Sequence, residues 1–301
     1  MQGKKTSKQE ILRCLSGYVE NSPERYELVL DLPAIRVKAP RETETALVIG
    51  GSEGWTEMIT MMLGENLADA VICGADSAAL DPNTIMRTGL AMNRGEKGIL
   101  FICGNNEQEK DNFLYADSLL DEVDIRSKVA FSCQHPMEPS EGVELFLTGN
   151  MLFSVKVAGA AASCDKPLEE IDKLVRQTRN NSSGIKMYLG EKYSLRKEVE
   201  QTLFLLLNET GIRKGDTVCA FMSGFGMLGN AELNLASTYL RAGLQKKGIL
   251  LHDLVLSPIT QACSGAALGI ALFCASDELL RYYDMPCRAQ FFERAGVGAQ
   301  S

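Results

Sequence analysis

Short apolar runs alternate with amphipathic stretches along the first half of the chain. Four runs have the length of buried strands and lie at residues 46–49, 70–73, 98–103 and 127–132. Between them, apolar residues recur at helical spacing and predict helices at 56–63, 81–92 and 112–122. Strands and helices in this alternation are typical of an α/β fold with a mostly parallel, helix-covered sheet.

The flanking segments predict further elements of both kinds. Two helices are expected before the first strand, one over 9–15 and a short one beginning at Ser22-Pro23, because proline suits the first turn of a helix. After the fourth strand come a helix of small residues and an amphipathic helix, then more helices and strands. Their ranges are 149–162, 168–181, 196–209 and 231–242 for the helices, and 217–222 and 248–256 for the strands, followed by segments at 265–273 and 277–283.

The polar run at 180–184 indicates a boundary between two domains. We therefore expect an N-terminal α/β domain over 1–183 and a C-terminal α/β domain over 184–301. The predicted strand at 217–222 is expected to end on a turn at 223–226, at the rim of the second domain.

Composition narrows the classes of function. The 301 residues are 45% hydrophobic and 23% charged, which is typical of a soluble globular protein. The net charge of −8 argues against a nucleic-acid partner, which needs a basic face. The most apolar stretch, 254–275, is interrupted by polar residues and is too polar for a membrane span. Nine scattered cysteines without a C-x-x-C pair predict neither a disulfide framework nor a metal site, and they suit a reducing cytoplasm.

Three predicted strands end on small or polar residues, and these ends are the candidate site. The first strand ends on Gly50-Gly51-Ser52, the second on Gly74-Ala75-Asp76-Ser77 and the third on Gly104-Asn105. Carboxyl ends of parallel strands meet at one edge of an open sheet, where ligands bind. Glycines there allow backbone amides to approach a small polar ligand.

Each of these residues also has a purely structural interpretation. Gly50, Gly51 and Ser52 either bind a small polyol or its phosphate or form a tight strand–helix turn, and we weigh the two evenly. Asp76 and Ser77 either line the cleft or cap a helix. Trp55 either closes over a ligand or fills the pocket, with the second slightly favoured. Glu109 is the weak candidate for a catalytic base, although a solvated acidic loop is the favoured interpretation.

The order of these segments resembles the dihydroxyacetone-binding, K-type subunit of dihydroxyacetone kinases over nearly the whole chain. Lys156-Val-Ala-Gly-Ala-Ala-Ala162 is the most specific match. The other matching segments are Val48-Ile-Gly-Gly-Ser52, Ala70-Val-Ile-Cys-Gly74, the loop from Asn105 to Asn112-Phe113, Asp277-Glu-Leu-Leu280 and Met285-Pro-Cys287. The resemblance implies a dimer that binds a small ketose, with a separate helical subunit as phosphoryl donor.

The chain departs from that family where the family's chemistry takes place. In the family one histidine binds the ketone covalently, and a second histidine and an aspartate assist phosphoryl transfer. Trp55 stands in place of the assisting histidine, the family's lysine is lost, and Glu109 is the nearest counterpart of the aspartate. The turn at 189–192 replaces that of the covalent histidine. The two histidines present, His135 and His252, fall on no family motif.

Two functions follow as alternatives. One is a K-type subunit of glycerol metabolism that binds a small ketose or its phosphate for phosphoryl transfer, with its classical activity lost or weak. The other is a non-catalytic paralogue that senses a ligand or regulates the same pathway. Whether the protein is an enzyme is left open. No cofactor is expected, because the sequence carries no nucleotide-binding motif.

Overall fold

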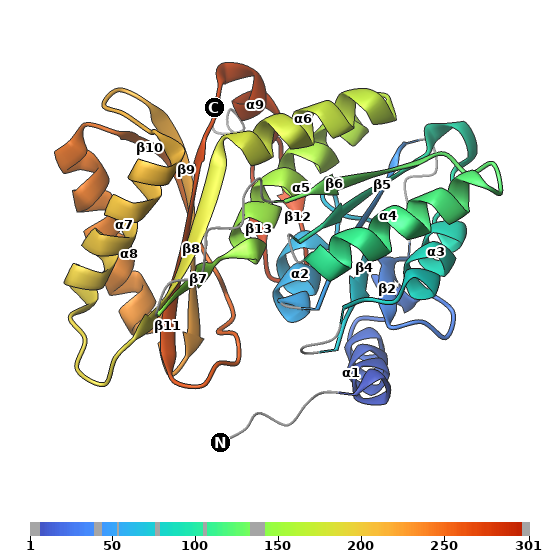
Figure 1. Cartoon of the computed structure of the whole chain (residues 1–301), viewed down its shortest axis with the longest axis horizontal. Coiled ribbons are helices and arrows are strands. Elements are labelled where there is room, and N and C mark those ends of the chain that lie inside the picture. Colours follow the sequence, from blue (N-terminus) through green and yellow to red (C-terminus); the bar gives the residue numbers. More distant parts are fainter. Residues whose placement is uncertain are drawn as a thin grey trace.

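The computed structural model describes residues 7–38, 44–52, 54–75, 79–104, 107–132 and 142–296. Two β-sheets stand side by side with a layer of helices between them, and further helices cover their outer faces (Figure 1). The helix that occupies the centre of this middle layer is α5 (Leu147–Ser163), whose small residues allow close packing on both sides. At Gly159, for example, an added Cβ would lie 2.2 Å from the carbonyl oxygen of Asn66.

The first sheet has six strands in the order β1-β2-β4-β3-β5-β6. The strands are β1 (Tyr26–Leu28), β2 (Ala34–Val37), β3 (Ala46–Gly51), β4 (Ala70–Cys73), β5 (Ile99–Cys103) and β6 (Ser127–Phe131). Strands β4, β3, β5 and β6 are parallel, and β1 and β2 join antiparallel at one edge. The predicted α/β fold with a mostly parallel sheet is confirmed.

The helix predicted from Ser22 is wrong. A single turn forms there, with the amide of Arg25 donating to the carbonyl of Ser22 at 3.0 Å, and the chain then enters β1. Tyr26 is buried against the core and its hydroxyl donates to the carbonyl of Leu63, so tertiary contacts outweigh the local helix signal.

Helices cover both faces of the first sheet. On the outer face lie α3 (Pro82–Ala91) and α4 (Glu107–Asp121), which contact each other. On the inner face lie α2 (Trp55–Met62), α5 and α6 (Leu168–Asn180), while α1 (Lys8–Glu20) packs beside β1 and β2. A single 3-10 turn, Gly95–Lys97, precedes β5. Since strand residues alternate between the two faces, Val48 packs outwards and Leu47 packs inwards.

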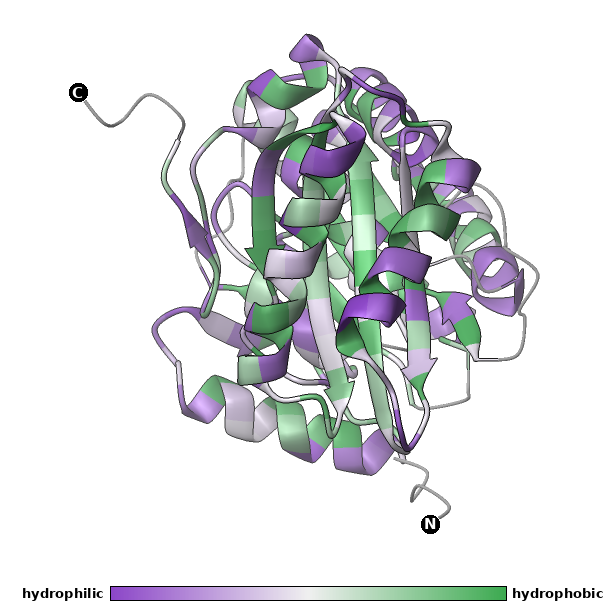
Figure 2. Ribbon diagram, turned by 90° about the vertical axis from the view of Figure 1, so that its left-hand side faces the viewer, coloured by the Kyte–Doolittle hydropathy of each residue, from purple (hydrophilic) through white to green (hydrophobic). Residues whose placement is uncertain are grey.

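The second sheet has five strands in the order β10-β9-β11-β8-β7. They are β7 (Val143–Leu145), β8 (Ser182–Leu189), β9 (Thr217–Gly226), β10 (Leu250–Leu256) and β11 (Ala266–Cys274). Two helices, α7 (Leu195–Thr210) and α8 (Asn230–Lys247), cover its outer face (Figure 2) and bury apolar residues such as Leu203 and Leu240 against it. The chain ends with α9 (Asp277–Tyr283) and the short strands β12 (Cys287–Arg288) and β13 (Glu293–Arg294).

Three features of the second sheet differ from the sequence prediction. Strand β8 was not predicted, and it begins at Ser182, inside the polar run at 180–184, because it pairs with β11 and β7. Residues 223–226 continue β9 and do not form the expected turn, because β9 pairs with β11 as far as Gly226. Residues 143–145 form β7, which joins the second sheet before the chain returns to the middle layer as α5. The division of the chain at 183 and 184 remains a prediction.

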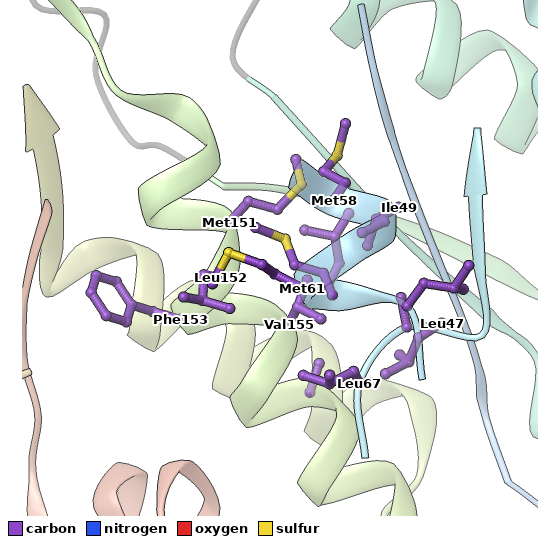
Figure 3. Close-up of a cluster of buried hydrophobic side chains, with 14 of the residues drawn as sticks. Leu47, Ile49, Met58, Met61, Leu67, Met151, Leu152, Phe153 and Val155 are labelled. Atoms are coloured by element: carbon purple, nitrogen blue, oxygen red, sulfur yellow. The ribbon is translucent and has the colours of Figure 1, made fainter. Parts of the chain in front are cut away.

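A single hydrophobic core lies between the two sheets. It contains inward residues of the first sheet, residues of α2 and α5, and residues of the second sheet such as Phe221 and Phe273. Figure 3 shows Met58 and Met61 of α2 beside Met151 and Val155 of α5. The helices of the middle layer therefore pack against both sheets at once.

Candidate functional site

The glycines that end β3 and β4 allow close packing between neighbouring strands and loops. Gly50 is buried inside β3, where an added Cβ would lie 3.0 Å from Cζ of Phe113. Gly51 is also buried, and its carbonyl accepts a 3.0 Å hydrogen bond from the amide of Gly74. A Cβ on Gly74 would lie 2.8 Å from Cα of Ser52. These two carboxyl ends are thus brought together, as predicted.

Glu109 lies inside this edge of the sheet. It belongs to the first turn of α4 and is 3% exposed, so the solvated-loop interpretation of this residue is wrong. Its Oε1 accepts a 2.8 Å hydrogen bond from the amide of Ser52. An added Cβ at Gly104 would lie 3.7 Å from Oε2, so the carboxyl group reaches between the ends of β3 and β5. The backbone amide at the end of β3 is therefore bound to a side chain of the protein itself.

Trp55 begins α2 and borders a cavity of about 170 Å³. Gly54 caps the helix with φ of 67°, a conformation that favours glycine, and an added Cβ there would lie 2.1 Å from Cγ2 of Thr148. The other wall of the cavity comes from the loop between β10 and β11. Its lining residues are Gly54, Trp55, Thr56, Ile259, Thr260, Gln261 and Ala262. The cavity thus opens between the two halves of the chain.

Glu57, one turn into the same helix, is fully buried beside this cavity. Ser223 of β9 donates to its Oε1 at 3.0 Å, and Gln261 donates from Nε2 to its Oε2 in a short hydrogen bond. The hydroxyls of Ser257 and Thr148 act to lower the pKa of this carboxyl group. One carboxyl group from the first half of the chain therefore binds two polar side chains, one from β9 and one from the loop between β10 and β11.

Burial raises the pKa of Glu57, and the surrounding hydrogen bonds only partly oppose this effect. The partners are hydroxyls and an amide, none of which carries a compensating positive charge. Sequence reasoning did not single out Glu57. The available signal was an acidic residue followed by Met58 and Ile59, on a helix that begins directly after a glycine turn.

Three predicted site residues, Asp76, Ser77 and Asn105, lie outside the described residues, as does His135, which was not predicted to belong to the site. The other histidine, His252, lies on the edge strand β10, where its Nε2 is 2.7 Å from Oδ1 of Asp284. It does not line the cavity beside Trp55. Within the described part of the chain, the candidate site thus contains carboxyl, hydroxyl, amide and indole groups.

Over the described ranges, no cluster of three or more histidine, cysteine or acidic side chains could hold a metal ion. Over the same ranges, no helix is long and apolar enough to cross a membrane.

A larger cavity, of about 380 Å³, lies at the opposite edge of the first sheet beside Tyr26, Asp69 and Arg288. This larger cavity is remote from the carboxyl ends of the strands. The cavity beside Trp55 is therefore the candidate site.

Comparison with known proteins identifies relatives at the level of sequence. A model of the Dak1 domain matches residues 16–193. The dihydroxyacetone-binding subunit DhaK of the PTS-dependent dihydroxyacetone kinase of Lactococcus lactis is 26% identical over 171 residues, which cover 54% of this chain and 50% of that protein. The chain thus matches about half the length of this relative.

Two solved structures share the fold over nearly the whole chain. One is described as "Regulation of the DHA operon of Lactococcus lactis", with a TM-score of 0.85 and 14% identity, and the match covers 97% of both chains. The other is the dihydroxyacetone kinase operon co-activator Dha-DhaQ, with a TM-score of 0.82 and 14% identity, covering 97% of this chain and 100% of that one. At this identity the likeness concerns the fold.

Proposed function

The chain belongs to the Dak1 domain family, and on this premise we propose that it is a K-subunit-like protein that binds a small ketose without phosphorylating it. In this proposal it acts as a ligand sensor or regulatory partner in dihydroxyacetone metabolism. A structural neighbour is itself an operon co-activator, which agrees with such a role. The classical phosphoryl transfer is expected to be absent or very weak.

The observation that carries the proposal is the position of Glu109. Its carboxyl group accepts the amide of Ser52 and lies between the ends of β3 and β5. Because this amide is bound by a side chain of the protein, it cannot donate a hydrogen bond to a phosphoryl group at this edge. The sequence also lacks the family's histidines at the matching positions. Loss of general acid–base assistance alone costs about 10²–10⁴-fold in rate.

The cavity beside Trp55 has the size and the lining to bind a small, uncharged ligand. Its volume of about 170 Å³ suits a molecule with few heavy atoms, and the side chains of Thr56, Thr260 and Gln261 supply hydroxyl and amide groups for hydrogen bonding. Among the residues that the structure describes, no cationic side chain lines it. A neutral ketose therefore fits this lining better than its phosphate does.

Ligand binding can be measured directly, because Trp55 is the single tryptophan and lies at the cavity. Titration with dihydroxyacetone and other small ketoses is expected to change the tryptophan fluorescence and to raise the melting temperature. Ala262→Leu, which fills the cavity, should abolish both effects. Ala231→Leu, at an exposed position of α8, is the matched control. Tighter binding of ketose phosphates than of ketoses would contradict the proposal.

A second candidate function is phosphoryl transfer with Glu109 as general base, and the burial of this carboxyl group favours it. An assay with dihydroxyacetone and the helical phosphoryl-donor subunit of the family separates the two functions. We expect no turnover above background from the wild-type protein. A clear rate that falls at least about 100-fold in Glu109→Gln would establish the second function instead. Gln can still accept the Ser52 amide, so the fold should be preserved.

A further inference from the structure

Two segments singled out in the sequence, 156–162 and 285–287, meet in the folded protein. Lys156 of α5 lies with Nζ 3.2 Å from Sγ of Cys287 on β12, although the two residues are 131 positions apart. The side chains are 3% and 4% exposed. This pair is remote in sequence from the candidate ligand site and has no part in the proposed function.

The surroundings of Lys156 are unusual for a buried lysine. Its Nζ lies 4.8 Å from the ring centroid of Tyr283 and 5.7 Å from that of Phe292. Among the residues that the structure describes, no carboxylate forms an ion pair with it. Buried amines normally have carboxylate partners or coordinate other polar groups. Here the thiol of Cys287 is the hydrogen-bonding partner, so nitrogen and sulfur are held in contact.

We propose that Lys156 and Cys287 form a site of oxidative modification, in which peroxide produces a covalent sulfur–nitrogen crosslink. Thiols oxidise to sulfenic acids, and a sulfenic acid condenses with a nearby nitrogen to a sulfenamide. The lysine amine is the nitrogen in contact with this sulfur. The crosslink would join α5, in the shared core, to the C-terminal hairpin of β12 and β13.

The reaction consumes one molecule of hydrogen peroxide and releases two of water. With the proton on Nζ, the thiolate of Cys287 attacks peroxide: the S–O bond forms, the O–O bond breaks, and the leaving hydroxide takes the proton from nitrogen. The neutral amine then attacks the sulfenic sulfur. The N–S bond forms, the S–O bond breaks, and the second hydroxide takes a proton from the same nitrogen. Sulfur loses two electrons and peroxide gains them.

The hairpin that carries Cys287 offers a route for peroxide. It has only two residues in each strand, and its neighbour Arg288 is exposed. Backbone hydrogen bonds of 2.8 and 3.0 Å connect Arg288 to Glu65, in the segment between α2 and β4. Short peripheral elements of this kind open more readily than a core sheet. Opening exposes the thiol briefly, and closing returns it to the amine.

Peptide mapping of the wild-type protein tests the proposal. After treatment with hydrogen peroxide and alkylation of the remaining thiols, we expect a peptide pair joined through Lys156 and Cys287 and lighter than its parts by two hydrogens. Dithiothreitol should release it. The exposed Cys14 and Cys164 serve as internal controls, which should be oxidised without joining a lysine.

Two variants and an unfolded control support the assignment. Cys287→Val keeps the side chain small and apolar and should lose the crosslink, and Lys156→Arg should retain the fold but give no sulfenamide. In concentrated urea the wild-type protein should give none either, because the contact is lost. Recovery of Cys287 as a free thiol or as a sulfinic acid, with Lys156 unmodified while Cys14 is oxidised, would overturn the proposal.

Discussion

At the scale of single residues, buried carboxyl groups distinguish this protein from an ordinary α/β domain. Glu57 and Glu109 both lie beside the carboxyl ends of the first sheet, and both bind groups of the protein itself. Glu109 accepts a hydrogen bond from a backbone amide, whereas Glu57 accepts hydrogen bonds from side chains in the other half of the chain. Buried polar groups of this kind fix geometry because leaving any partner unsatisfied is costly.

Glu57 should make stability depend on pH. Its pKa in the folded protein is raised above the ordinary value of 4.5, so the folded state retains a proton that the unfolded state has lost. This contribution to folding is therefore complete below about pH 4.5 and declines as pH rises towards the folded pKa. Glu57→Gln, which is neutral at every pH, should remove this decline. Urea midpoints measured for both proteins between about pH 5 and 8 provide the check.

Glu57→Ala is the matched disruptive variant. It leaves Ser223 and Gln261 without their acceptor and opens a cavity, so we expect a loss of about 2–4 kcal/mol in the free energy of unfolding. If Glu57→Gln and the wild-type protein kept a constant difference in stability across this pH range, the raised pKa would be contradicted.

At the scale of elements, most helices and strands begin where local signals place them. Asp81 is an example: its Oδ1 accepts the amide of Thr84 at 2.9 Å, as expected for a cap before Pro82. The helix beginning at Glu107 was predicted five residues too late, because its first turn is acidic and polar. Such a turn is also compatible with a loop, and only the burial of Glu109 distinguishes the two.

Asp81→Ala should destabilise the protein by about 1 kcal/mol, since α3 loses its cap. Burial alone would raise the pKa of Asp81, but hydrogen bonds from Thr84 lower it overall. The stabilisation is thus present at neutral pH and should be lost as pH falls through that lowered pKa. Thermal unfolding at neutral and acidic pH tests both statements. Asp81→Asn, which retains a capping oxygen, should stay close to wild type at neutral pH.

The fold could be predicted from sequence further than the site could. The spacing and length of the apolar runs predicted the four parallel strands, because a strand that is buried on both faces is apolar along its whole length. The contacts of Glu57 could not be predicted, since Ser223 and Gln261 lie far away in the chain. The same holds for β7, a three-residue strand whose partners come after two further helices. Contacts between distant segments leave no periodic signal.

At the scale of the whole molecule, the two sheets depend on one another through their shared core. Phe146 precedes α5 and stacks on Phe221 of β9, with ring centroids 5.4 Å apart, and also contacts the ring of Phe225. It belongs to the same cluster as Leu47 and Ile49 of the first sheet. Loss of one half would therefore expose a large apolar surface on the other.

Phe146→Ala should cost about 3–5 kcal/mol of stability, and both halves should still unfold together. Fluorescence of Trp55 follows the first half, and far-ultraviolet circular dichroism follows all elements. We expect the two probes to give the same urea midpoint in the wild-type protein and the same lowered midpoint in the variant. Separate midpoints would show that the halves unfold independently.

The place of β11 has a consequence for synthesis of the protein. This strand lies between β9 and β8 in the second sheet, yet it is the last long strand of the chain. Until residues 266–274 have been synthesised, no strand of the sheet connects the pair of β7 and β8 to the pair of β9 and β10. The nascent chain therefore carries two incomplete parts of this sheet, with unpaired strand edges, until β11 has been made.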